Sequence, residues 1–209
     1  MSQNVHSLRS DIQKLNLDII IDIMTRKNID VYCIQETWLD GDFVKEIDGY
    51  TIFHHGLKEQ VCSRGQNGVA IILSSTFSKY YKSSGSLTPV ISKNNDLTTR
   101  RFIGLKLNIE VKVKGKNKGA FRKKKVKTKI IKLFISSVYH PVDDKDQIEF
   151  NTFLSTIYSS VSQNHFFASG QDMNANIGCR CEKTEFDCIG PHGIKNRNSK
   201  GIEALNLLT

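Results

Sequence analysis

The stretch Asp30-Val31-Tyr32-Cys33-Ile34-Gln35-Glu36-Thr37 joins a β-rich, mostly apolar run to a polar end. Such a run is typical of a buried strand, and Glu36 would then emerge at the rim of the core. A carboxylate in that place needs a cation or hydrogen-bond donors. A hard metal such as Mg²⁺ would serve, because it takes one or two carboxylates and keeps several waters. Backbone donors at the end of the strand are the alternative.

Polar side chains also follow two apolar runs later in the chain. Asp172 and Asn174 lie two residues apart, and on a strand that spacing points both side chains the same way. Asp172 could orient a water, and the Asn174 amide could donate to a phosphate oxygen; a local Asx-turn is the alternative. Tyr139 ends a strand, where its hydroxyl could bind a phosphate or its ring could simply pack. His140 should point to the opposite face, as a surface or packing residue.

The hydrophobic pattern predicts both helices and strands. Apolar residues at helical spacing occupy 8–23, 150–161 and 202–208, and β-rich runs occupy 2–5, 50–54, 68–73, 103–113, 126–139 and 166–169. In 103–113 the apolar residues alternate strictly with polar ones, which indicates a long strand with one wet face. Strands dominate, with helices among them. This order favours an α/β fold with one mixed sheet, or two sheets flanked by helices.

The positive charge is concentrated in one segment. The formal charge of the chain is +9, and residues 112–132 hold eleven lysines and arginines without one acid, so the rest is nearly neutral. The segment is predicted to be a basic hairpin that contacts a nucleic-acid backbone, because neutralised phosphates release counterions. Its candidate contact residues are Lys123, Lys124, Lys125 and Lys127. A solvated loop without a partner is the alternative. Residues 123–127 also resemble a nuclear import signal, which predicts a nuclear protein.

The composition excludes several other classes. No apolar run approaches the roughly 20 residues of a spanning helix, and the chain starts without a secretory signal, so no membrane partner is expected. Five cysteines, an odd number, argue against a secreted disulfide framework and favour an intracellular protein. Cys179, Cys181, Cys188 and His192 could suggest zinc, but their spacing fits no common finger, and free thiols are the better interpretation.

Four motifs, taken in order, resemble the endonuclease/exonuclease/phosphatase superfamily. More narrowly, the chain resembles the endonuclease domains of non-LTR (LINE-type) retrotransposons and the craniofacial development protein 2-like proteins. The motifs are Ser2-Gln3-Asn4-Val5, Gln35-Glu36-Thr37, Val138-Tyr139-His140-Pro141 and Gly170-Gln171-Asp172-Met173-Asn174-Ala175. The resemblance implies a four-layer α-β-β-α sandwich of two mixed sheets. It also implies a nuclease that uses Mg²⁺, with Mn²⁺ as an alternative, and acts on DNA, with a reverse transcriptase domain fused in the complete element.

The resemblance also assigns roles to single residues. Asn4 and Glu36 inherit the metal-ligand roles. Asp172, Asn174 and Tyr139 inherit the catalytic roles: Asp172 orients the water, and the other two contact the phosphate. Gln171 is an extra residue compared with the family motif. Asn198, in a loop before a predicted helix, is a further candidate for nucleic-acid binding.

The sequence departs from the family at its end. The family continues with a further Asp and a Ser-Asp-His motif, whereas this sequence stops at Thr209 within a helical pattern. We therefore expect a single domain over residues 1–209 that is C-terminally incomplete and weakly active or inactive. Two alternatives stay open at this point. One is a non-catalytic, nucleic-acid-binding relic, and the other is a repair or small-substrate phosphodiesterase of the same superfamily.

Overall fold

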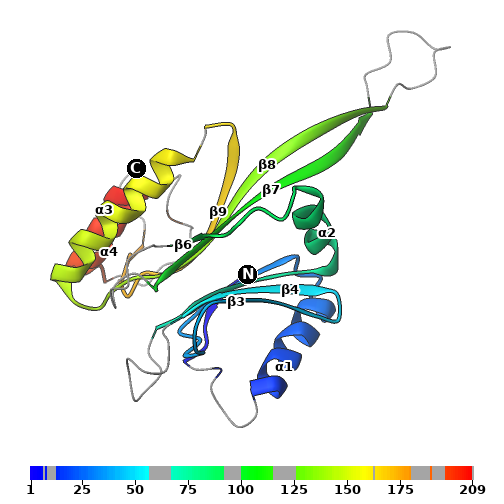
Figure 1. Cartoon of the computed structure of the whole chain (residues 1–209). Helices are drawn as coiled ribbons and strands as arrows, with labels where there is room; N and C mark the ends of the chain where they lie inside the picture. Colours follow the sequence, from blue (N-terminus) through cyan, green and yellow to red (C-terminus); the bar gives the residue numbers. More distant parts are fainter. Residues whose placement is uncertain are drawn as a thin grey trace.

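Two β-sheets lie face to face between helices in the computed structural model (Figure 1). The model describes residues 1–6, 8, 13–56, 67–91, 100–114, 126–161, 163–179, 189 and 196–208. The elements in chain order are β1 (Ser2–Asn4), α1 (Gln13–Arg26), β2 (Val31–Gln35), β3 (Phe43–Ile47), β4 (Tyr50–His55), β5 (Val69–Leu73), α2 (Ser75–Ser83), β6 (Val90–Ile91), β7 (Phe102–Lys114), β8 (Val126–Tyr139), α3 (Asp144–Ser160), β9 (His165–Asp172) and α4 (Ser199–Leu208).

Both sheets are mixed. The five-stranded sheet has the order β1-β2-β5-β4-β3, and the four-stranded sheet has the order β6-β7-β8-β9. In each sheet one edge pair is parallel, β1 with β2 and β8 with β9, and the other neighbours are antiparallel. The carboxyl ends of these four strands consequently lie at one end of the sandwich.

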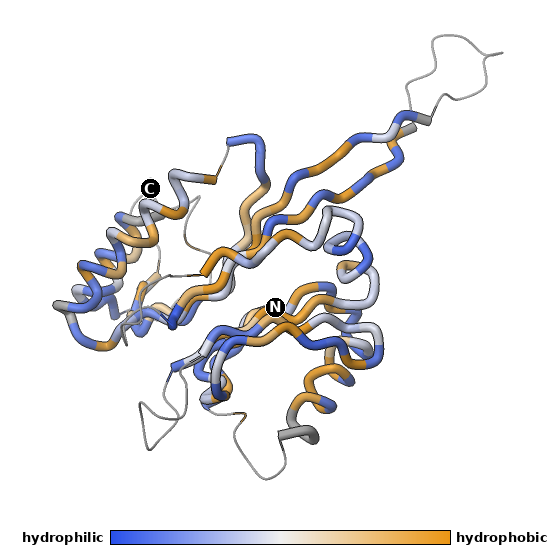
Figure 2. The backbone as a smooth tube through the Cα atoms, in the orientation of Figure 1, coloured by the Kyte–Doolittle hydropathy of each residue, from blue (hydrophilic) through white to orange (hydrophobic). Residues whose placement is uncertain are grey.

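Three apolar clusters hold the layers together. The inner faces of the two sheets pack through residues such as Phe53, Ile71 and Leu105. The outer face of the five-stranded sheet packs on α1, and the outer face of the four-stranded sheet packs on α3. Helix α4 lies against α3 on the same outer side (Figures 1 and 2). This arrangement confirms the predicted four-layer α-β-β-α sandwich of two mixed sheets.

The long strand β7 differs from its prediction near the sheet centre. The alternating residues Ile103, Leu105 and Leu107 face the inner core as expected. The opposite face is wet only in part, because Phe102 on that face is buried beneath α3. Strand β9 is also longer than the predicted strand 166–169, and α2, β3 and β6 were not predicted. Within the described residues, no helix is long and apolar enough to cross a membrane.

Strands β7 and β8 extend beyond the sandwich (Figure 1). They pair antiparallel from Phe102↔Val138 to Lys114↔Val126, as the sequence pattern predicts for a hairpin. Strand β9 pairs with β8 only from Lys132 onward, and β6 pairs with β7 only at residues 103–104. Residues 109–114 of β7 and residues 126–131 of β8 therefore pair only with each other, as a two-stranded ribbon.

Candidate active site

The two sheets approach each other closely where the ends of β1, β2, β8 and β9 meet. A Cβ atom added to Gly170 would lie 2.4 Å from the Cβ of Cys33 and 2.8 Å from the Cβ of Ser2. Only glycine leaves room for this contact, because real Cβ atoms do not approach so closely. The register then places Asn4 beside Gln35 and Tyr139 beside Asp172. Residues from four separate motifs are thus brought to one end of the sandwich.

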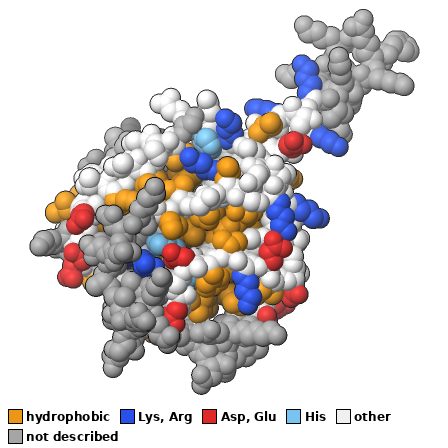
Figure 3. Space-filling view, viewed as in Figure 1, with side chains coloured by type: hydrophobic (Ala, Val, Ile, Leu, Met, Phe, Trp, Pro, Cys, Tyr) orange, Lys and Arg blue, Asp and Glu red, His pale blue; other side chains and the backbone are white. Residues whose placement is uncertain are grey.

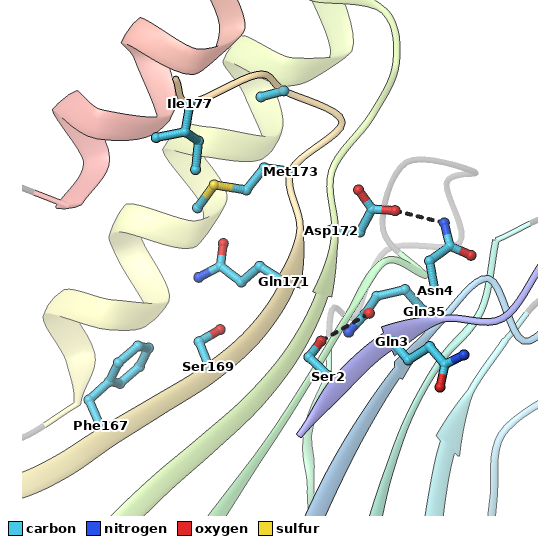
Figure 4. Close-up of a pocket in the computed structure, with 11 residues that line it drawn as sticks. Ser2, Gln3, Asn4, Gln35, Phe167, Ser169, Gln171, Asp172, Met173 and Ile177 are labelled. Carbon is cyan, nitrogen blue, oxygen red and sulfur yellow. Dashed lines mark hydrogen bonds between the residues drawn. The ribbon is translucent and has the colours of Figure 1, made fainter. Parts of the chain in front are cut away.

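The Asn4 side chain joins the two carboxylates of the site. Its Nδ2 atom donates to Glu36 Oε1 at 2.5 Å. The same atom donates to Asp172 Oδ2 at 2.7 Å (Figure 4). Its Oδ1 atom accepts from the backbone N–H of His6, whose Nδ1 lies 3.3 Å from Glu36 Oε2. Two carboxylates predicted from separate strand ends therefore converge on one point.

The backbone around this point adopts an unusual conformation. His6, Glu36, Trp38 and Asn174 all have φ between 45° and 55°, in the left-handed region that favours glycine. At Glu36 this conformation follows directly after the last residue of β2. Left-handed residues other than glycine cost about 1–3 kcal/mol each, and they gather at functional sites more often than elsewhere. The strain supports a functional interpretation of the cluster.

Asp172 and Asn174 form the predicted local turn as well as facing the site. Asp172 Oδ1 accepts from the Asn174 backbone N–H at 3.0 Å, which is the Asx-turn that the sequence left open. The Asn174 Nδ2 atom donates to the His140 carbonyl at 2.6 Å. The turn holds the Asp172 carboxylate in a fixed direction. Both of its oxygens accept a hydrogen bond, one from Asn174 and one from Asn4.

Tyr139 is the last residue of β8, and His140, which follows it, points to the opposite side, toward Phe150 of α3, as alternation predicts. The Tyr139 phenol lies in the site, where the Glu36 carboxylate and the Asn174 amide both act on it. Burial, followed by the Glu36 carboxylate, raises the pKa of Tyr139, so the hydroxyl keeps its proton near neutral pH. The His140 ring is 1% exposed, and its Nε2 lies 3.0 Å from Gln171 Oε1. Burial lowers the pKa of His140, which makes it a neutral packing residue behind the site.

Arg101 is a site residue that the sequence reasoning missed. Its guanidinium lies 4.7 Å from the centre of the Tyr139 ring, and the charge of Glu36 also acts on it. Its Nη1 makes only a long contact of 3.4 Å with the His140 carbonyl. Its Nε atom is buried and has no hydrogen-bond partner among the described residues. Burial lowers the pKa of Arg101, partly offset by Tyr139. A largely buried cation with unused donors is suited to bind an anion.

Gln35 and Thr37, the two neighbours of Glu36 in sequence, are held in the core by hydrogen bonds. Gln35 is 1% exposed, and its Nε2 atom donates to Ser137 Oγ at 3.0 Å and to the Gly170 carbonyl at 3.2 Å. It therefore bridges the two sheets under the site. Thr37 Oγ1 lies 2.7 Å from His54 Nε2 in a fully buried contact. The residues on both sides of Glu36 are thus fixed, which positions its carboxylate.

A cleft of about 670 Å³ adjoins these residues (Figure 4). Its polar lining comes from the strand ends, including Asn4, Gln35 and Asp172. Its apolar lining comes from Phe167 and from Ile177 in the segment after β9. The Asp172 carboxylate is therefore open to the cleft, and the Glu36 side chain is 13% exposed.

The remaining candidate residues fall outside this cluster. Asn198 caps α4, because its Oδ1 accepts from the backbone N–H groups of Gly201 at 2.8 Å and Asn176 at 3.1 Å. This gives it a structural role, and its contact with nucleic acid stays a prediction. Lys127 is exposed on β8. Lys123, Lys124 and Lys125 lie outside the described residues, as do Cys181, Cys188 and His192 of the zinc alternative.

The donors in the cluster fit a hard divalent cation. Among the described residues, no group of three His, Cys, Asp or Glu side chains could hold a metal. Mg²⁺ does not need such a group, because it is bound through one or two carboxylates and keeps waters. Glu36 supplies one such carboxylate, and Asn4, the other predicted ligand, presents its Nδ2 atom to Glu36 and to Asp172. The fit therefore rests on the Glu36 carboxylate, and Asn4 would join it after its amide turns, because its Oδ1 atom accepts from the His6 backbone N–H.

No family model matches the sequence, and no curated protein matches it. Among solved structures, the chain is similar to an endonuclease/exonuclease/phosphatase family protein from Leptotrichia buccalis C-1013-b. The TM-score is 0.51 and the identity 12%, and the match covers 84% of this chain and 66% of that one.

Two other matches have a TM-score of 0.48. The endonuclease domain of TRAS1, a telomere-specific non-LTR retrotransposon, is 14% identical, with 99% of this chain and 67% of that one covered. An AP endonuclease from Archaeoglobus fulgidus is 18% identical, with 99% and 68% covered. This chain spans about two thirds of the length of these proteins. The likeness to the Leptotrichia protein confirms the predicted fold: the chain folds as an endonuclease/exonuclease/phosphatase protein does.

Proposed function

We propose that the chain is a metal-dependent phosphodiesterase that nicks DNA. The observation that carries the proposal is the Asn4 amide held between the Glu36 and Asp172 carboxylates, with Arg101 beside them. The carboxylates can bind a metal cation, and the Arg101 guanidinium, which has unused N–H groups, can bind a phosphate beside it. The order of the four motifs supports the same chemistry.

Glu36 and Asn4 would hold the metal, Mg²⁺ or Mn²⁺. When bound, the cation would neutralise negative charge that develops on the phosphate. Glu36 is held in position for metal binding because its two neighbours, Gln35 and Thr37, are buried. Replacing either neighbour should therefore weaken metal binding without removing a ligand.

Asp172 is the residue that we assign to the attacking water. Its carboxylate is held by Asn4 and by the turn to Asn174, so its direction is set before substrate binds. A carboxylate fixed in this way can accept a proton from water and direct its oxygen toward phosphorus. Attack would proceed in line, on the side opposite the leaving oxygen.

Three donors are placed to stabilise the phosphate. Tyr139 offers a protonated hydroxyl, Asn174 an amide, and Arg101 a guanidinium with unused N–H groups. Such donors act most strongly where charge grows in the transition state. The buried position of Arg101 strengthens its effect, because little water screens it.

The ribbon of β7 and β8 supports a polymeric substrate rather than a small phosphate ester. Lys112, Lys127 and Lys129 are exposed on it, and the sequence between the two strands adds further lysines. We assign the chain more narrowly to a LINE-type retroelement, nuclear in location and fused to a reverse transcriptase in the complete element. The resemblance of the four motifs and the import-like run 123–127 support this assignment. The intact carboxylate cluster favours an enzyme over a relic that only binds nucleic acid.

A plasmid-nicking assay tests the proposal. The purified chain should relax supercoiled DNA slowly with Mg²⁺ or Mn²⁺, because we expect a weak activity, and it should stop when EDTA is added. The Asp172→Asn variant should lose about 100- to 10,000-fold in rate. The matched control Asp18→Asn changes an exposed carboxylate on α1 and should keep the wild-type rate. Metal-independent nicking, no nicking at all, or equal rates for the two variants would contradict the proposal.

A further inference from the structure

Among the described residues, no third strand pairs with the distal part of the β7–β8 hairpin. Beyond the pair Asn108↔Lys132, the described ribbon comprises residues 109–114 and 126–131, and α2 contacts β7 where this ribbon leaves the sandwich. Ile130 is 58% exposed and Val113 is 44% exposed. A two-stranded ribbon with exposed apolar side chains gains little from burial, so its length calls for a functional explanation.

Basic side chains lie on both faces of this distal ribbon. Strand pairing puts Lys127 opposite Val113 and Lys129 opposite Val111, on the face that continues the inner core. Lys112 pairs with Thr128 on the other face. Figure 3 shows Lys and Arg side chains on different sides of the projecting part. A flat phosphate surface could be contacted by one face only, so charge on both faces points to a partner that surrounds the ribbon.

We propose that the distal ribbon inserts into the major groove of a B-form DNA duplex. This inference rests on the proposed function for its choice of DNA. The major groove is about 12 Å wide and admits a two-stranded ribbon, whose two faces then meet the phosphates of the two groove walls. An A-form RNA duplex has a deep and narrow major groove that excludes such a ribbon.

The ribbon binds far from the catalytic cluster. Lys127 and Tyr139 lie on the same strand, β8, near its opposite ends. A strand rises about 3.4 Å per residue, so these positions are about 40 Å apart. The same distance along B-form DNA is about 12 base pairs. The ribbon therefore contacts the duplex about one helical turn away from the bond that is cut.

The experiment compares two triple variants of the full chain. Lys112→Gln/Lys127→Gln/Lys129→Gln removes the ribbon charge, and Lys27→Gln/Lys45→Gln/Lys79→Gln removes the same charge from exposed sites elsewhere. Binding to a 24-base-pair DNA duplex is measured over a range of salt concentrations. The slope of log affinity against log salt should fall by about 0.9 per lost contact in the ribbon variant and stay unchanged in the control. The Lys→Arg version of the ribbon variant should keep the wild-type slope, which checks that folding is intact.

The groove is tested with modified duplexes. DNA with glucosylated hydroxymethylcytosine, whose sugars fill the major groove, should bind the wild type more weakly but leave the ribbon variant unaffected. Netropsin, which occupies the minor groove, should not compete. An unchanged salt slope would overturn the proposal. Equal losses on DNA and RNA duplexes would also overturn it, leaving only a general cationic surface. Turnover is not measured, so absence of nicking would contradict the proposed function alone.

Discussion

The two ends of strand β8 lie in opposite environments. At its carboxyl end, Ser137 and Tyr139 are buried between two sheets that almost touch at Gly170. At its amino end, Lys127 and Ile130 are exposed on the two-stranded ribbon. One strand thus provides a rigid end for chemistry and a projecting end for contact. We infer that packing holds the first region, whereas strand pairing holds the second.

Alanine at two positions of β8 should reveal the largest difference between these regions. Ile135 is 2% exposed between the sheets, whereas Ile130 is 58% exposed on the ribbon. Ile135→Ala should lower the free energy of unfolding by about 2–5 kcal/mol, because it removes buried methyl groups and leaves a cavity. Ile130→Ala should change it by less than about 0.5 kcal/mol. Urea denaturation measures both, and equal losses would contradict the proposed division.

Replacing Arg101 should slow the nicking reaction without weakening the binding of DNA by the ribbon. Arg101→Gln should slow plasmid nicking by about 100- to 1,000-fold, the usual loss when one transition-state donor is removed. Affinity for the DNA duplex should change little, because the ribbon contacts persist. Arg26→Gln on the exposed side of α1 is the matched control. A variant that loses affinity and keeps its rate would place Arg101 in substrate binding only.

Gln35 should be the most sensitive polar residue under the site. Gln35→Ala leaves the groups that it bridges, including the Ser137 hydroxyl, without their partner in a buried place. The free energy of unfolding should fall by about 1–3 kcal/mol. Gln163→Ala, at an exposed turn, should have almost no effect. Equal values for the two variants would mean that the sheets are held together without the Gln35 bridge.

Acid should weaken the catalytic end through His54. Burial lowers the pKa of His54 to about 4, so the folded protein holds this ring neutral while the unfolded chain can protonate it. Stability is therefore complete above pH 6.5 and falls as the pH drops from 6.5 toward 4. The loss from this group should be about 1 kcal/mol at pH 5.5. Denaturation midpoints across this range should fall less steeply for His54→Gln than for the wild type.

Local sequence was enough to find the residues at strand ends. Glu36, Asp172 and Tyr139 each follow or end an apolar run, and such runs identify themselves through composition and periodicity. The orientation of the hairpin away from the site also follows from strand direction, since Lys127 lies near the start of β8 and Tyr139 ends it.

Contacts that depend on pairing between distant segments could not be predicted in this way. Arg101 reaches the site because its carbonyl accepts from the Tyr139 backbone N–H at the start of the β7–β8 ladder. Gln35 bridges the sheets only because Gly170 allows them to approach. Asn198 Oδ1 accepts from the backbone N–H of Asn176, 22 residues earlier in the chain. None of these partners is close in sequence, so periodicity carries no signal for them.

Magnesium binding to the full chain tests the central claim most directly. Isothermal titration of the wild type should detect Mg²⁺ binding, and Glu36→Gln should weaken it at least about tenfold, because the carboxylate charge is lost and its shape is kept. Glu149→Gln, an exposed carboxylate on α3, should bind Mg²⁺ as the wild type does. Both variants should retain the salt-dependent DNA affinity of the ribbon. Unchanged Mg²⁺ affinity in Glu36→Gln would contradict the claim that the converging strand ends form a metal-dependent hydrolytic site.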